Sequence, residues 1–181
     1  MTACVGVHVK NNLPFSKSVR VLAVSALLGL SLHSAAIAQP SAAQGDTVAW
    51  TVQSSDVAKN GKAILTLTGA VRDGWHVYSL KQLPDGPTPL LVTLDKNDVA
   101  KADGAPAGSL PTKIHDPAFG LDTQFYESAF SLKVPVRLGA HPAAGPQSIP
   151  LSVRFQTCNG RVCQPPKTVH LSATINLPAG G

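Results

Sequence analysis

Apolar and polar residues alternate along short segments of the chain, and the clearest of these segments is Ser128–Leu138. Its apolar positions are every second residue, namely Phe130, Leu132, Val134, Val136 and Leu138. Because successive side chains of a β-strand point to opposite faces, this pattern predicts a strand with one buried and one solvated face. Pro135 has no N–H to donate, so we expect this strand to lie at a sheet edge or to carry a bulge.

Six further segments have the composition or the alternation of strands, and turn-forming Gly, Pro, Asp and Asn residues separate them. They are Thr47–Ser54, Lys62–Ala70, Trp75–Leu80, Leu90–Asp95, Ile149–Phe155 and Val169–Leu177. No segment after residue 46 shows a helical period. The sequence therefore predicts one all-β domain over residues 47–178, an antiparallel β-sandwich of immunoglobulin-like type.

The stretch from Lys96 to about Asp122 is the least regular part of the chain and is rich in Ala, Gly, Pro and Asp. We expect a long irregular connection there, of the kind that is usually functional or mobile. Phe119 is a large aromatic residue among small ones in this stretch, and composition alone favours a core position for its ring.

The first 38 residues have the features of a secretory signal peptide. Basic residues precede a twelve-residue apolar run, Val21–Leu32, and Ala36-Ile37-Ala38 offers small residues to a signal peptidase. We expect a helical signal peptide over residues 1–38, cleavage after Ala38, and a disordered leader over residues 39–46. A membrane anchor is the alternative, but the run is shorter than the roughly 20 residues that a span needs.

Cleavage after Ala38 leaves 143 residues, which is enough for one domain with a hydrophobic core. Three basic residues leave with the signal peptide, so the net charge falls from +5 to +2. A nearly neutral surface lacks the basic stripe that nucleic-acid binding requires.

The mature chain keeps two cysteines, Cys158 and Cys163, because Cys4 lies in the signal peptide. Asn159-Gly160 between two alternating segments predicts a hairpin that brings the two cysteines face to face. In an exported protein such a pair forms a disulfide by default. A disulfide that closes so short a loop constrains the unfolded chain little, which argues mildly for chemistry rather than for a structural staple.

The residues around the pair are compatible with redox chemistry. Pro165-Pro166 ends the ladder and protects the edge beside Cys163 from strand pairing. Arg161 between the cysteines would favour a thiolate by its charge, although a solvated hairpin tip explains it equally well. A metal site would need further ligands from His76, His115, His141 or His170, and zinc prefers four. No hydrolase motif and no phosphate-binding loop is present, and no metal or cofactor is expected.

The segment Cys158-Asn-Gly-Arg-Val-Cys163-Gln-Pro-Pro resembles the cysteine hairpin of the N-terminal periplasmic domain of DsbD-type thiol:disulfide interchange proteins. The segment Asp73-Gly74-Trp75-His76-Val77-Tyr78 is similar to that family's D-G-aromatic-x-x-Tyr segment, and the resemblance covers about Thr47 to Leu177. It implies an immunoglobulin-like sandwich with active cysteines on a hairpin at one end. It also implies a periplasmic location and an association with cytochrome c biogenesis.

By its position in the family's motif, Cys163 matches the cysteine that forms the mixed disulfide with partner proteins. Cys158 matches the cysteine that resolves it. Phe119, with Asp116 nearby, matches the cap that shields the pair between encounters. Tyr78, Tyr126, Trp75 and Arg161 are candidates for lining the site, although aromatic residues in a sandwich are more often core.

The resemblance implies partners of two kinds. A thioredoxin-like or membrane-embedded donor supplies two electrons, and oxidised exported proteins receive them. The best-known members of the family have one more residue between the cysteines, and they have acidic residues where Pro117-Ala118 stand here. They also continue into a transmembrane and a thioredoxin-like domain, so for a chain that stops at Gly181 we expect a separate donor protein.

Two hypotheses for the function follow from these observations. The first is a periplasmic relay that exchanges disulfides through Cys158 and Cys163 and needs no cofactor. The second is a non-catalytic β-sandwich binding module in which the same disulfide is structural.

Overall fold

The computed structural model describes residues 41–44, 47–140 and 143–177. The predicted signal peptide over residues 1–38 and its cleavage after Ala38 lie outside the described residues. Within the described part of the chain, no helix is long and apolar enough to cross a membrane.

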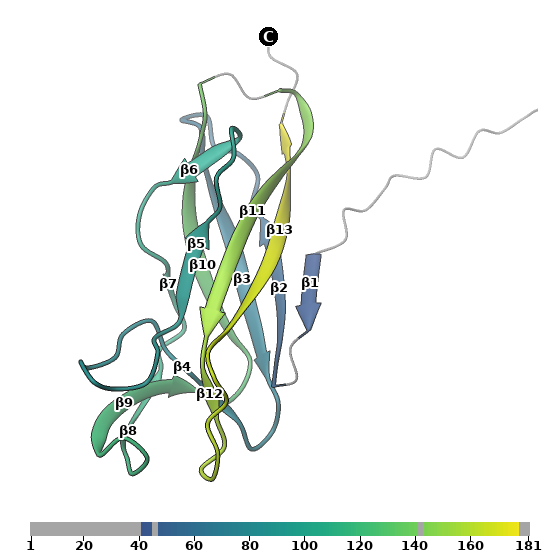
Figure 1. The fold of residues 1–181 in the computed structure, drawn as a ribbon. Helices are drawn as coiled ribbons and strands as arrows, with labels where there is room; N and C mark the ends of the chain where they lie inside the picture. The colour runs from purple at the N-terminus through teal and green to yellow at the C-terminus, as the bar shows by residue number, and fades with distance from the viewer. Residues whose placement is uncertain (1–40, 45–46, 141–142, 178–181) are drawn as a thin grey trace, which may run out of the picture. The chain divides into compact units, whose positions relative to one another are not determined.

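The described chain folds into three antiparallel sheets, which confirms the predicted all-β sandwich (Figure 1). The largest sheet has the order β1-β2-β3-β10-β6, with β7 also pairing β10, and the sheet packed against it has the order β13-β11-β5. The strands of these two sheets are β1 (Ser41–Gln44), β2 (Val48–Ser54), β3 (Lys62–Val71), β10 (Phe130–Leu138), β6 (Ala100–Ala102), β7 (Ala107–Gly108), β13 (Lys167–Leu177), β11 (Gly145–Phe155) and β5 (Leu91–Leu94).

Aromatic side chains from both large sheets meet at the centre of the sandwich. The fully buried Trp50 ring of β2 lies 5.6 Å from the ring of Phe130 and 5.2 Å from the ring of Phe155 in the opposite sheet. Gly69 of β3 pairs with both Trp50 and Phe130, and a Cβ atom there would lie 2.7 Å from the Phe130 ring. The two rings therefore pack over a position that only glycine leaves open.

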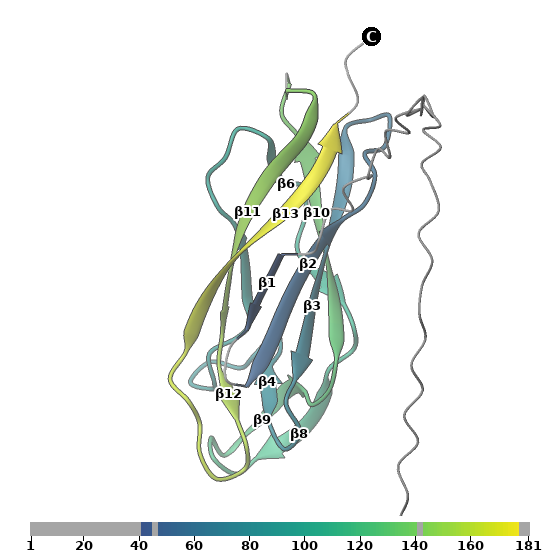
Figure 2. The same ribbon diagram turned by 90° about the vertical axis from the view of Figure 1, so that its right-hand side faces the viewer.

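A smaller sheet of four strands forms one end of the molecule, and Figures 1 and 2 both place it beside the cysteine hairpin. Its order is β12-β4-β9-β8. The strands are β12 (Thr157–Cys158), β4 (His76–Tyr78), β9 (Leu121–Tyr126) and β8 (Thr112–Asp116). β12 follows the long β11 after one residue, so the rigid sandwich fixes the position of the hairpin.

Three expectations from the sequence need correction. Lys96 to Asp122 is not an irregular connection, because β6, β7, β8 and the start of β9 lie within it. The strands there are short, and β8 is exposed at four of its five residues, so their apolar alternation is weak. Ser41–Gln44 forms strand β1 against β2, where the sequence predicted a disordered leader over residues 39–46.

The third correction concerns Pro135. β10 shows the predicted alternation of buried and solvated residues, but it lies inside the largest sheet and not at its edge. The carbonyl of Pro135 accepts a hydrogen bond from Asp103 N at 2.9 Å, on the side where β6 has ended and β7 has not begun. Because N–H and C=O of one strand residue point the same way, the missing donor faces this interruption of the neighbouring strand.

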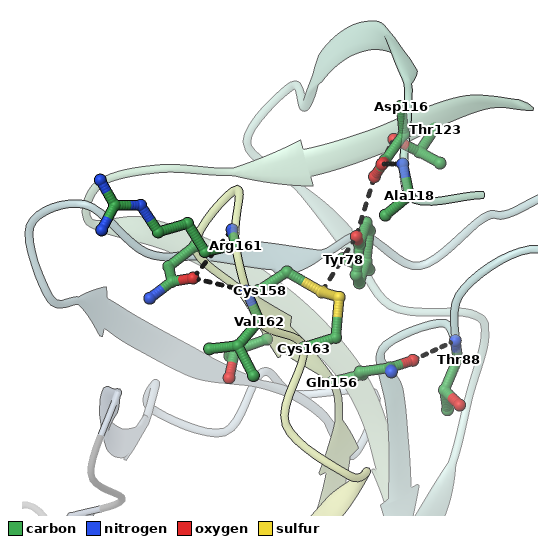
Figure 3. Close-up of a disulfide and its surroundings, with 12 residues drawn as sticks. Tyr78, Thr88, Asp116, Ala118, Thr123, Gln156, Cys158, Arg161, Val162 and Cys163 are labelled. Carbon is green, nitrogen blue, oxygen red and sulfur yellow. Dashed lines mark hydrogen bonds between the residues drawn. A yellow bond between two sulfur atoms is a disulfide. The ribbon is translucent and has the colours of Figure 1, made fainter. Parts of the chain in front are cut away.

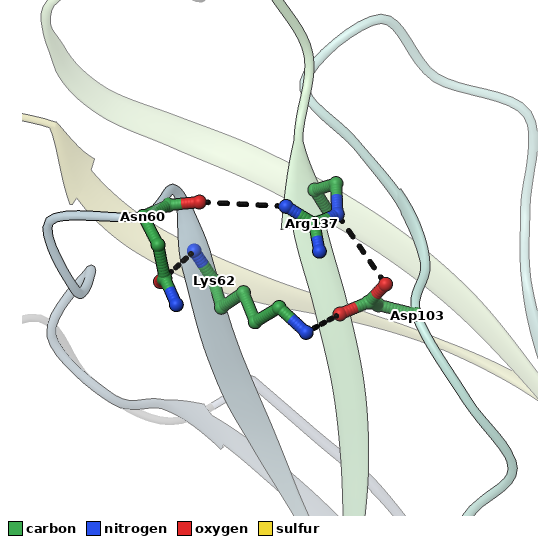
Figure 4. A network of polar contacts seen from close by, with 4 residues as sticks. All are labelled: Asn60, Lys62, Asp103 and Arg137. Atoms are coloured by element: carbon green, nitrogen blue, oxygen red, sulfur yellow. Dashed lines mark hydrogen bonds and ion pairs between the residues drawn. The ribbon is translucent and has the colours of Figure 1, made fainter.

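A charged network lies where β3 begins and β10 ends, far from the hairpin (Figure 4). Asp103 binds Lys62 Nζ at 2.8 Å and Arg137 Nε at 3.3 Å. The hydrogen bond from Lys62, followed by the charge of Arg137, lowers the pKa of Asp103. The network is exposed, so it contributes little stability and no chemistry.

Candidate functional site

The cysteine hairpin closes through a turn that its own side chains stabilise. Asn159 Oδ1 accepts hydrogen bonds from the backbone N–H groups of Arg161 at 3.1 Å and Val162 at 2.9 Å. Asn159 N donates to Val162 O at 3.1 Å, and Gly160 has a φ of 77°, which glycine adopts readily. The four residues of the turn thus bring Cys163 opposite Cys158.

Cys158 and Cys163 form a disulfide with their Cα atoms 4.1 Å apart (Figure 3). Their environments differ, because Cys158 is 3% exposed whereas Cys163 is half-buried. A visiting protein can therefore reach the sulfur of Cys163 more easily than that of Cys158.

Three aromatic rings from the small sheet surround Cys158. Tyr78 and Phe125 are buried with it in one cluster, and they pair directly across β4 and β9. His76 pairs with Cys158 across β4 and β12, and its ring lies 5.1 Å from Tyr78 and 4.6 Å from Phe125. Because paired residues and every second residue of a strand share one face, all these side chains lie on the same side of the sheet.

A buried polar chain runs from the disulfide to the β8–β9 turn. The Tyr78 hydroxyl donates to Asp116 Oδ2 at 2.8 Å and lies 3.2 Å from Cys158 Sγ (Figure 3). The phenol has one proton, and the carboxylate is the stronger acceptor. Burial, and then the hydrogen bond and charge of Asp116, raise the pKa of Tyr78 far above its ordinary value. Tyr78 therefore stays a neutral hydrogen-bond donor at every physiological pH.

The turn between β8 and β9 packs beside the buried cluster that contains Cys158, and Asp116 holds the shape of this turn. Asp116 Oδ1 accepts from Ala118 N at 2.9 Å, while the backbone carbonyl of Asp116 accepts from Phe119 N and Gly120 N. The turn presents Phe119, whose half-buried ring packs on the cluster with Cys163 and lies 5.8 Å from Tyr78. We call Asp116–Gly120 the cap turn.

A tyrosine-to-phenylalanine change is expected to alter how stability depends on pH. In the unfolded chain a tyrosine titrates near 10, and the folded-state pKa of Tyr78 is raised, so its contribution to stability is complete below about pH 10 and is lost above it. Above that pH, the free energy of unfolding should fall more steeply in the unmodified protein than in Tyr78→Phe. At neutral pH the variant should lose about 1–2 kcal/mol, because a buried hydrogen bond is removed.

Urea unfolding at a series of pH values measures this effect. Tyr126→Phe is the matched control, since burial alone raises the pKa of that phenol, and its effect should have the same sign and be smaller. Identical alkaline slopes for the unmodified protein and Tyr78→Phe would contradict the account of Tyr78.

The structure places the other predicted site residues differently. Arg161 is exposed, and Figure 3 shows its side chain extending away from the sulfur atoms. Tyr126 packs in the main core, stacked on Phe130 at 4.0 Å, and its hydroxyl donates to Ser109 O. Trp75 is half-buried under the Arg72 guanidinium, 5.2 Å from the ring centre. Arg161, Tyr126 and Trp75 thus lie outside the buried cluster of Tyr78, Phe125 and Cys158.

Sequence reasoning missed His76 and Phe125 as neighbours of the cysteines. The signal for His76 was present, since it lies two residues before Tyr78 on the same predicted strand and so shares its face. Phe125 and its neighbour Thr123 lie on β9, a strand that was not predicted. A further missed contact is that of Gln156, whose Oε1 accepts from Thr88 N at 2.8 Å and ties the loop before β5 to the hairpin.

Two other kinds of site are absent from the described residues. Within residues 41–44, 47–140 and 143–177, no group of three His, Cys, Asp or Glu side chains is placed to hold a metal ion. Ser152, His170 and Asp95 lie together, but the Ser152 hydroxyl donates directly to Asp95 at 2.7 Å and His170 Nδ1 faces the same hydroxyl. No imidazole lies between the hydroxyl and the acid, so this group is not a hydrolytic triad.

An antiparallel sandwich that carries a cysteine pair on a hairpin at one end, beside a cluster of aromatic side chains, has the architecture of a thiol:disulfide interchange domain. The sequence model of the family described as "Thiol:disulfide interchange protein DsbD, N-terminal" matches residues 43–174. The chain belongs to this family.

Solved structures and curated sequences were also compared with the chain. The N-terminal domain of Neisseria meningitidis DsbD in the reduced form is 22% identical, with a TM-score of 0.45, and the match covers 69% of this chain and 85% of that one. The N-terminal periplasmic domain of ScsB from Proteus mirabilis is 17% identical, with a TM-score of 0.50, covering 71% of this chain and 46% of that one. The ScsB likeness shows the fold. A comparison with curated proteins gave no match.

Proposed function

We propose that this domain relays two electrons in the periplasm, from a thioredoxin-like or membrane-embedded donor to oxidised exported proteins. The observation that carries the proposal is the unequal burial of the two cysteines, with Cys158 buried and Cys163 only partly buried. The family membership supports disulfide exchange as the chemistry. The signal-peptide features of residues 1–38 support the location.

The relay has three steps, and the first of them comprises two thiol–disulfide exchanges, in which one donor thiol attacks and the second resolves. The donor dithiol first reduces the Cys158–Cys163 disulfide and becomes oxidised itself. The Cys163 thiolate then attacks a partner disulfide, so that one partner sulfur joins Cys163 and the other leaves as a thiolate. Cys158 finally loses its proton and attacks Cys163 Sγ, which releases the second partner thiol and restores the internal disulfide.

Tyr78 supports this chemistry from its position beside Cys158. Its hydroxyl lies 3.2 Å from the sulfur and can donate a hydrogen bond to a thiolate there. Such a bond stabilises the negative charge that develops on Cys158 when the disulfide opens. Asp116 positions the Tyr78 hydroxyl, because its carboxylate accepts a hydrogen bond from that hydroxyl in the oxidised protein.

The cap turn protects the pair between encounters with partners. Phe119 and Cys163 both pack against the buried cluster of Tyr78, Phe125 and Cys158, and burial of the Phe119 ring stabilises the closed position by about 1.5–3 kcal/mol at most. That free energy keeps the turn mostly closed while leaving an open form accessible. A partner gains access to Cys163 by displacing Phe119.

Replacing Phe119 with alanine should expose Cys163 without changing the fold. We expect the reduced Phe119→Ala variant to react with iodoacetamide about tenfold faster at Cys163, because the opening free energy falls by about 1.4 kcal/mol or more. Leu110→Ala is the matched control, since Leu110 is 93% exposed on the preceding connection. Equal alkylation rates in Phe119→Ala and the unmodified protein would mean that the cap turn does not shield the pair.

The experiment that tests the proposed function uses the Cys158→Ala variant in the cell that exports the protein. Without the resolving cysteine, mixed disulfides through Cys163 should accumulate, and non-reducing gels should show adducts that disappear on reduction. Acid quenching and alkylation preserve them for identification. If no adduct forms at normal expression, the relay loses its support and a structural disulfide becomes the better account.

A further inference from the structure

His76 places an imidazole ring against the aromatic cluster of the site. It pairs with Cys158 across β12 and β4, so their Cβ atoms are expected to lie about 4.5–5.5 Å apart on one face of the sheet. Its ring packs against Phe125 at 4.6 Å and against Tyr78 at 5.1 Å. These contacts hold the imidazole next to the resolving cysteine.

One ring nitrogen of His76 has no hydrogen-bond partner among the described residues. Nε2 is buried and makes no hydrogen bond to any described residue. An unpaired buried nitrogen is unfavourable, and phenylalanine would fill the same space without that penalty. In the oxidised protein neither sulfur carries a proton, whereas after reduction the neighbouring Cys158 thiol becomes a donor.

The charge state of the ring suits it to accept a proton. Burial lowers the pKa of His76, while the negative charges of Asp116 and Glu127 oppose that shift. The imidazole is therefore neutral at neutral pH, and the two carboxylates stabilise the imidazolium that a transferred proton would create. Tyr78 is the other polar group beside Cys158. Its hydroxyl is protonated and donates a hydrogen bond to Asp116, so it cannot act as the base.

We propose that His76 is the proton acceptor for Cys158 in the resolving step, an inference that rests on the proposed function. When the Cys158 thiol attacks Cys163 Sγ of the mixed disulfide, its proton passes to His76. The bond between Cys158 and Cys163 forms, and the bond between Cys163 and the partner sulfur breaks. The partner sulfur leaves as a thiolate, and His76 returns the proton to that thiolate or to water. The net result is that the partner loses its disulfide and the domain gains one.

The resolving step can be isolated with Ellman's reagent, 5,5′-dithiobis(2-nitrobenzoate). Attack by Cys163 of the reduced protein releases one thionitrobenzoate, and attack by Cys158 on the mixed disulfide releases the second. In stopped-flow absorbance we expect His76→Phe to slow the second release at least tenfold at pH 7 and to leave the first unchanged. The two proteins should converge above about pH 9, because the Cys158 thiolate then forms without a base.

His170→Phe is the matched control, since its side chain is 75% exposed on β13 and both phases should keep their rates. His76→Gln gives a second variant without a basic nitrogen should His76→Phe not fold. A second phase that is unchanged, or that slows by the same factor at every pH, would overturn the proton-acceptor role and leave the relay intact. Release of fewer than two thionitrobenzoates by the unmodified protein would instead refute the exchange chemistry and the inference with it.

Discussion

The Cys163→Ala variant is expected to lose disulfide exchange with protein substrates. Its exchange rate should fall to the rate measured without the protein. The remaining thiol, Cys158, is 3% exposed, and a protein disulfide cannot reach it in line for attack. The Cys158→Ala variant should behave differently, because its Cys163 thiolate can still carry out the first attack. It should stop after one encounter, with a stoichiometric mixed disulfide and no turnover.

Purified proteins test this pair of variants directly. The reduced variants are mixed with an oxidised thioredoxin-like protein, quenched in acid at intervals and separated without reduction. Val162→Ala is the matched control, because Val162 is exposed in the same turn and takes no part in the reaction. Exchange by Cys163→Ala at the rate of the unmodified protein would reverse the assignment of the two cysteines.

The Asp116→Ala variant should lose about 2–4 kcal/mol of unfolding free energy and open the cap turn. The buried Asp116 carboxylate accepts hydrogen bonds from Ala118 N, from the Tyr78 hydroxyl and, at 3.4 Å, from Thr123. Alanine would leave buried donors without partners, at about 1–3 kcal/mol for each group that stays dry. With the turn loosened, the alkylation of reduced Cys163 should accelerate about tenfold.

Asp122→Ala is the control for this change, because Asp122 lies on the same hairpin with its side chain 79% exposed and paired only with His115 in the described contacts. Its effect on stability should stay within about 0.5 kcal/mol. Denaturant unfolding and alkylation kinetics give both quantities for each variant. If Asp116→Ala were as stable and as slowly alkylated as Asp122→Ala, the carboxylate would not hold the cap turn.

The strands that the sequence predicted well are those with one face on the main core. β10 follows the alternation of Ser128–Leu138, and β11 and β13 follow that of the segments on either side of the cysteines. β8 was missed because four of its residues are exposed and its side chains carry no pattern. Its stability comes from the ladder to β9 and from the buried Asp116, and neither contact is visible in local sequence.

The candidate site was predictable where the chain itself brings residues together. Cys158 and Cys163 lie five residues apart across an Asn-Gly turn, so their contact follows from local geometry. The contact of Tyr78 with Cys158 joins residues 80 positions apart, and it depends on β4 pairing with β12. Periodicity alone cannot give such a pairing.

The sequence prediction named Tyr126 and not Phe125, and the register of β9 explains the difference. Phe125 and Tyr126 are consecutive on β9, so they point to opposite faces of the small sheet. Phe125 joins Cys158, while Tyr126 turns into the main core with Phe130. Without the register of β9, the sequence offers no way to choose between the two rings.

The position of the disulfide explains why its reduction should leave the sandwich folded. It closes a hairpin at one end of the molecule, while the Trp50 core and the β11–β13 ladder lie within the two large sheets. A link across so few residues removes little entropy from the unfolded chain. A disulfide whose loss does not unfold the protein is free to serve as a reagent.

Equilibration of the purified protein with glutathione buffers of known potential tests the central claim most directly. The fraction of reduced Cys158–Cys163 pair is counted by alkylation and mass spectrometry after acid quenching. A relay requires a midpoint well above about −300 mV, within reach of thioredoxin-like donors, and this is the result we expect. A midpoint below about −300 mV would show a structural disulfide and contradict the proposed exchange.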